Sequence, residues 1–94
     1  MYDLGFFGKT TVVAVTAVAA PFGPVEGIPM KRRSYIISSD RHFHIDRQAA
    51  ADPTTSLRLP PDRPYRISLF GGETLSVIRA TGETDGSVWI TEDE

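Results

Sequence analysis

YRISLFGGETLSVIRATGETDGSVWIT, residues Tyr65 to Thr91, carries the strongest structural signal in the chain. Its three short apolar runs alternate or nearly alternate with polar residues and are separated by glycine-bearing turns at 71–73 and 81–86, the second of which contains an Asp-Gly pair typical of hairpins. Alternation places successive side chains on opposite faces of a strand, and glycine permits the chain to reverse between strands. We therefore expect three antiparallel strands in a meander, with an apolar face that a second layer must cover. Ile78 breaks the alternation, which predicts either cover on its other side or a bulge.

Length and composition point to one small domain. The chain has 94 residues, seven prolines and eight glycines, which favours turns over long helices. Its net charge of −2 argues against a general nucleic-acid binder, and the lack of cysteine excludes disulfides, thiolate metal sites and a thiol nucleophile. A small domain without such staples often relies on oligomerisation or on a partner surface, and we expect a homo-oligomer.

Upstream of this stretch, Thr10 to Ala20 is rich in valine and threonine, which favours a strand. Both of its faces are apolar, so we expect it to be covered twice. The run is shorter than the roughly 20 residues of a membrane-spanning helix, and no membrane partner is expected. It resembles a signal peptide, but Asp3 and a single lysine, Lys9, precede it, so we do not expect cleavage.

The next segment, Pro21 to Met30, holds three prolines and two glycines, which predicts a long connection without a strand. Its apolar residues either form an interaction loop or fold over the end of the sandwich, and the sequence favours neither alternative over the other. The basic triplet Lys31–Arg33 reads as a solvated strand edge in preference to a phosphate contact.

Residues Tyr35–Ser39 and His42–Asp46 predict a hairpin whose turn lies near Asp40. Alternation turns Phe43 inward and places His42 and His44 together on the opposite face. Two histidines at that spacing are able to bind a metal ion, but the polar outer face of a strand is the favoured interpretation. We therefore predict no metal site, cofactor or catalytic residue, and no enzymatic activity.

Together these patterns predict an all-β fold, a small antiparallel β-sandwich or barrel-like meander of about six to seven strands. The predicted sandwich covers residues 10–91, after an extended arm at 1–9 and before an acidic tail at 92–94. Residues 47–64 should form a loop that contains a short extended piece at 56–59. Six large apolar residues at positions that the local core does not claim are the predicted partner interface: Phe6, Phe7, Phe22, Ile28, Phe70 and Trp89.

The segment from Leu59 to Thr91, LPPDRPYRISLFGGETLSVIRATGETDGSVWIT, resembles the C-terminal half of small structural proteins of tailed bacteriophages. The upstream SYIISSDRHFHI, Ser34 to Ile45, is similar to the first hairpin of those proteins, so the resemblance covers Ser34 to Thr91. It implies a virion protein, assembled in the host cytoplasm, that decorates the capsid and binds the major capsid protein.

Three alternatives remain open. One is a head–tail connector or neck-associated virion protein. Another is a carbohydrate- or ligand-binding β module that uses Trp89 and Phe70 as stacking platforms. The least favoured is a metal-dependent enzyme of jelly-roll type built on His42 and His44.

Overall fold

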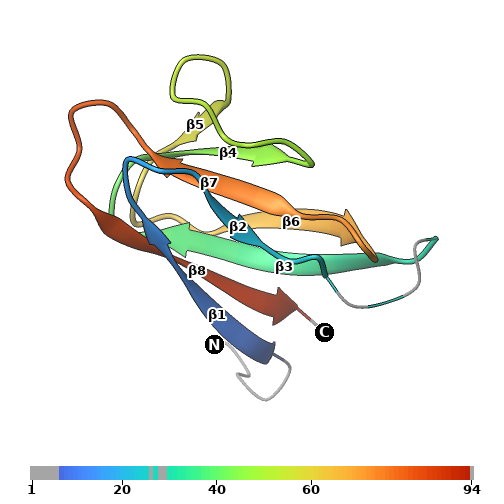
Figure 1. Ribbon diagram of the computed structural model, residues 1–94. Coiled ribbons are helices and arrows are strands. Elements are labelled where there is room, and N and C mark those ends of the chain that lie inside the picture. The colour runs from blue at the N-terminus through green and yellow to red at the C-terminus, as the bar shows by residue number, and fades with distance from the viewer. Residues whose placement is uncertain (1–6, 26, 28–29, 94) are drawn as a thin grey trace.

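Two antiparallel sheets of four strands pack face to face in the computed structural model, which describes residues 7–25, 27 and 30–93 (Figure 1). In spatial order, sheet A contains β1 (Phe7–Val15), β8 (Gly86–Asp93), β3 (Arg32–Ser39) and β6 (Tyr65–Phe70). Sheet B contains β2 (Ala20–Phe22), β7 (Leu75–Arg79), β4 (Phe43–Arg47) and β5 (Leu57–Leu59). The predicted all-β sandwich is confirmed, with eight strands in the described part of the chain.

The core lies between the sheets and follows directly from the alternation in the sequence. Val88 and Ile90 on β8 are fully buried, and the intervening Trp89 faces the other way. Sheet B contributes Phe43 and Val77, which are also fully buried. The inward direction predicted for Phe43 and Ile45 is therefore confirmed. Burial of each such side chain contributes about 1.5–3 kcal/mol, so this layer is the main stabilising element.

The predicted meander over residues 65–91 is wrong in its pairing, although its three strands lie where the sequence placed them. β6 pairs with β3 in sheet A, β7 pairs with β2 and β4 in sheet B, and β8 returns to sheet A between β1 and β3. The chain thus crosses between the sheets at both glycine turns, as Figure 1 shows for the orange and red strands. β6 and β8 therefore lie in sheet A, and β7, which connects them in sequence, lies in sheet B.

Turn geometry explains why these connections are not hairpins. Gly72 and Gly82 have φ values of 87° and 88°, and each is the third residue of a turn closed by a backbone hydrogen bond, Glu73 N–H to Phe70 O and Glu83 N–H to Ala80 O. Positive φ at the third residue alone is the geometry of a type II turn. Type II turns splay the flanking strands, whereas tight hairpins use the mirror-image turns. The Asp85–Gly86 pair, predicted as a hairpin turn, instead leads into β8.

The predicted hairpin at residues 35–46 is wrong for a related reason. β3 and β4 belong to different sheets and are joined by an arch at residues 40–42. The Asp40 carboxylate accepts a hydrogen bond from Ser87 N–H (2.8 Å), which fastens the arch to the start of β8. A Cβ on Gly86 would collide with the side chains of Asp40 and Arg41, so glycine is required there for close approach.

Several predicted boundaries also change. Strand β1 begins at Phe7, inside the predicted arm, and ends at Val15, so residues 16–19 are a connection and not strand. Strand β8 runs to Asp93, which makes residues 92 and 93 strand and not a free tail. The three-residue β2 contains Pro21, where no strand was expected. Proline has no backbone N–H to donate to a neighbouring strand. It is tolerated in β2 because β2 is the edge strand of sheet B and pairs only with β7 among the described strands.

The segment after β2 folds over the end of its own sandwich, which is one of the two alternatives for residues 21–30. Val25 is buried, its N–H donates to Glu73 O (3.0 Å), and its carbonyl accepts from Gly72 N–H (2.8 Å). These two bonds fasten the segment to the β6–β7 turn.

Candidate functional site

The outward side of sheet A is a wide surface that no other segment in the described part of the chain is seen to cover in Figure 1. Strand register aligns Val12 on β1 with Trp89 on β8, and Trp89 with Ser38 on β3. Val12 is 57% exposed and Trp89 is 37% exposed. We call this surface the open face; it comprises the outward residues Thr10, Val12, Ala14, Ser34, Ile36, Ser38, Ser87, Trp89 and Thr91.

None of the nine residues of the open face carries a charge, whereas Arg32 on β3, Arg66 on β6 and Asp93 on β8 also face outward and border them. The hydroxyls of Thr10 and Thr91 lie 2.8 Å apart and bond to each other across the β1–β8 ladder. At the margin, Arg66 forms an ion pair with Asp93 at 2.9 Å, so these two charges neutralise each other. Depletion of charge around an aromatic residue is typical of the centre of protein interfaces.

The outward side of sheet B is different, because the chain covers it with its own loop, residues 48–56. His44 and Ile78 are paired in register on this side, and both are buried. Ala51 of the loop is buried as well, and its N–H donates to the Ser76 hydroxyl (2.9 Å). The break in alternation at Ile78 therefore reflects cover from the other side, one of the two predicted explanations.

The covering loop is held in shape by short polar contacts. The Asp52 carboxylate accepts hydrogen bonds from the side-chain O–H (2.7 Å) and the backbone N–H (2.8 Å) of Thr54. These bonds hold the pKa of Asp52 below its ordinary value because they stabilise the charged form. The bond from the Thr54 hydroxyl has the largest effect. Ser56 bonds to Asp46 through its hydroxyl (3.0 Å), which ties the end of the loop to β4.

The two histidines do not form a metal site with their neighbours. His44 Nδ1 lies 2.9 Å from the Ser56 carbonyl oxygen, which only accepts, so this nitrogen carries the proton. His42 Nε2 lies 3.9 Å from a Glu83 carboxylate oxygen. Among the described residues, no group of three or more His, Cys, Asp or Glu side chains is arranged to hold a metal ion. The expectation that His44 lies on a half-exposed face is wrong, because the loop buries it.

The residues predicted as a partner interface lie in separate places. Phe6, Ile28 and the side chain of Phe7 are outside the described residues. Phe22 packs against the core, with its ring edge-on to Tyr35 at 5.7 Å between centroids, so the local core does claim it.

Of that predicted interface, Trp89 and Phe70 face outward on sheet A but do not form one groove. The Arg32 guanidinium lies 5.5 Å from the Phe70 ring centroid. Trp89 aligns with Ser38 and Phe70 with Arg32, six residues apart along β3. That separation is about 20 Å, which is too far for one small sugar to touch both rings.

Sequence reasoning identified Trp89 but missed the rest of the open face. Val12 was assigned to a strand covered on both sides, whereas β1 is an edge strand with one bare side. The signal in the sequence is the series of Ser and Thr residues at outward positions of β1, β3 and β8, where charges occur only at Arg32 and Asp93, at one end of β3 and β8.

Comparisons of the chain with protein-family models, with curated proteins and with solved structures found no match. In the part of the chain that the structure describes, no helix has the length and hydropathy needed to cross a bilayer.

Proposed function

We propose that the protein is a non-enzymatic structural subunit that docks on a partner protein through the open face of sheet A. The observation that carries this proposal is the uncharged surface around Trp89, with exposed Val12 beside it. A solvent-exposed face of an antiparallel sheet is normally polar, and exposed apolar groups gathered on it mark a candidate contact surface. An aromatic residue at the centre of such a face is the residue type that most often dominates binding energy.

For the setting of this docking we propose a tailed-phage particle, in which the subunit decorates the capsid and binds the major capsid protein. Support comes from the sequence resemblance over Ser34 to Thr91. A head–tail or neck position is the alternative within the same particle. Repetition of one modest contact over many copies would give strong total attachment without a large interface on each copy.

A ligand-binding module is the second candidate function, favoured by the exposed Trp89 ring amid hydroxyl side chains. The wide separation of Trp89 and Phe70 limits such a site to one stacking platform. A monomer that binds simple sugars in calorimetry, and loses binding on Trp89→Ser, would support the module against the structural subunit.

The test of the structural role uses particles purified from the source culture. Mass spectrometry should find the chain in them in many copies, and tagged protein should rebind to particles stripped of it. We expect Trp89→Ser to weaken rebinding by at least about tenfold, since truncation of a central aromatic often costs more than 1–2 kcal/mol.

Val18→Ser is the matched control, because Val18 is 74% exposed but lies in the β1–β2 connection. It should rebind like the wild type, and both variants should melt near the wild-type temperature. Particles that lack the chain would overturn the virion setting. Equal rebinding by the Trp89 variant would overturn the role of the open face.

A further inference from the structure

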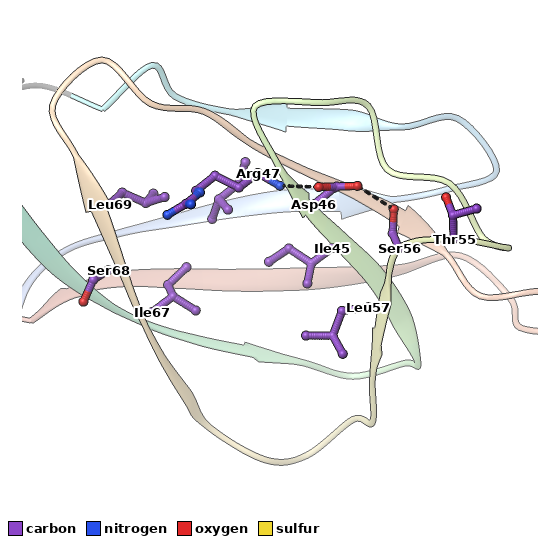
Figure 2. A pocket seen from close by; sticks show the side chains of 10 residues that line it. Ile45, Asp46, Arg47, Thr55, Ser56, Leu57, Ile67, Ser68 and Leu69 are labelled. Carbon is purple, nitrogen blue, oxygen red and sulfur yellow. Dashed lines mark hydrogen bonds between the residues drawn. The ribbon is translucent and has the colours of Figure 1, made fainter.

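A second apolar feature lies on the side of the sandwich where the edges of the two sheets meet. There β6 is the edge of sheet A and β5 the edge of sheet B, and a groove of about 460 Å³ opens between them. Figure 2 shows Ile45, Leu57, Ile67 and Leu69 around this groove, with Asp46, Arg47 and Ser56 along its upper rim. Leu57 is 65% exposed, so the groove presents apolar side chains to solvent.

The groove stays open because β5 is too short to close it. β5 pairs only with residues 43–45 of β4, which leaves Asp46 and Arg47 beyond its end. Across the groove, β6 pairs only with β3 among the described strands. Its other edge therefore has no ladder with a described strand, although at its end Phe70 is already bonded to Glu73, through its N–H (2.7 Å) and its carbonyl oxygen (3.1 Å). A free edge beside an apolar groove is the arrangement that accepts an added strand.

The chain itself contains a segment with the matching pattern. Tyr2, Leu4 and Phe6 alternate with Asp3 and Gly5 in the residues that precede β1. An extended segment of this sequence presents its three large apolar side chains on one face. A groove of this volume lies within the usual range of about 300–1,000 Å³ for sites that enclose several such groups.

An extended Tyr2–Phe6 segment is too short to lie along β6 of its own chain. Phe7 is level with Asp93, Asp93 with Ser34, and Ser34 with Ser68 on β6, which is three strand spacings or about 14 Å across sheet A. Tyr2 lies five residues before Phe7, and five extended residues span at most about 17 Å. Crossing the sheet would use nearly all of that length, so none would remain to run along β6.

We propose that Tyr2–Phe6 of one copy adds as a strand to the β6 edge of a second copy, with Tyr2, Leu4 and Phe6 in the groove between β5 and β6. Such a contact joins different surfaces of the two copies, so repetition gives a ring or an open chain of subunits. The inference uses neither the open face nor the virion setting, and each of the two proposals can fail alone.

Cysteine cross-linking tests the contact directly, because the natural chain has no cysteine. Full-length Leu4→Cys protein is mixed with full-length Leu57→Cys protein of different tag mass and oxidised. A disulfide requires Cα atoms within about 7 Å, so we expect a mixed dimer of the two variants. Two controls replace one member of the pair. Asp3→Cys, one position out of phase, is mixed with Leu57→Cys, and Val18→Cys, remote from the groove, is mixed with Leu4→Cys. Each mixture should give at least about tenfold less mixed dimer.

Other occupants of the groove give different products. A cross-link within one chain of the Leu4→Cys/Leu57→Cys double variant, at high dilution, would overturn the exchange between copies. Preferential Leu57→Cys homodimers would show that the β5 strands of two copies meet each other and would also overturn it. Trp89→Ser should leave the Leu4–Leu57 product unchanged, which separates this contact from docking of the open face.

Sedimentation of uncross-linked protein provides the second measurement. Leu57→Glu should weaken self-association by about tenfold to hundredfold, because it places a charge among the apolar groups of the groove. Val18→Glu should have no effect on association. A wild-type chain that remains monomeric at the highest concentration tested, or equal association by both variants, would overturn the proposal.

Discussion

The outward faces of the two sheets differ in burial: a loop covers that of sheet B, whereas that of sheet A is exposed. On sheet B the chain covers His44, Ser76 and Ile78 with its own loop, whereas on sheet A Val12 and Trp89 remain exposed. Both faces belong to four-stranded antiparallel sheets of the same core. A partly apolar outward face is therefore not by itself evidence of a binding surface. What matters is whether the same chain supplies a cover, and residues 7–25, 27 and 30–93 do so on one side only.

The largest expected difference between the two faces is in the free energy of unfolding lost when one isoleucine on each face is replaced by alanine. Ile78→Ala should lower the free energy of unfolding by about 2–4 kcal/mol, because Ile78 is 8% exposed and its loss leaves a cavity under the loop. Ile36→Ala on the open face should lower it by about 1 kcal/mol or less, since solvent fills the space. Urea unfolding of both variants measures this. Equal losses would mean that the two faces are equally covered.

A smaller difference is expected for serine. Ser76→Ala removes the acceptor of the buried Ala51 N–H, which should lower the free energy of unfolding by about 1–3 kcal/mol. Ser38→Ala on the open face should stay within about 0.5 kcal/mol of the wild type. Hydrogen exchange at Ala51 provides the second measurement. If Ala51 stays fully protected in the Ser76 variant, the loop is held by other contacts.

The smallest expected effect concerns the pH dependence of the covering loop. Hydrogen bonds from Thr54 lower the pKa of Asp52 in the folded chain below its unfolded value. Asp52 therefore contributes stability above its ordinary pKa, and that contribution is lost as pH falls through the folded pKa. Melting temperatures measured from neutral to acidic pH should fall less for Asp52→Asn than for the wild type. Asp62→Asn controls for the loss of one negative charge, and an identical response of both variants would contradict the assignment.

The sequence was sufficient to predict the strands but not their partners. Alternation is local, so the runs at Tyr65, Leu75 and Val88 could be placed from neighbouring residues alone. Pairing depends on contacts between distant residues, such as the bond from Ser87 N–H to Asp40, which joins positions 47 residues apart. Turn type depends on the backbone at Gly72 and Gly82, and a Gly-Gly or Thr-Gly pair is compatible with more than one turn.

The candidate site could be predicted only in part for the same reason. Trp89 was identified because its neighbours Val88 and Ile90 claim the inward face. Val12 was missed because the sequence of β1 does not say whether a further layer covers it. The burial of His44 was missed because it depends on a loop whose path is set by Ser56 and Ser76.

The place of β8 has a consequence for the way the protein is made. Of the described strands it comes last in the sequence, yet it lies between β1 and β3 and supplies the only ladder that β1 has among them. Until Asp93 has left the ribosome, the apolar strand β1 has nothing to pair with, and sheet A stays divided. Since pairing between remote segments is also slow, the chain must complete its fold after synthesis of this domain and not during it.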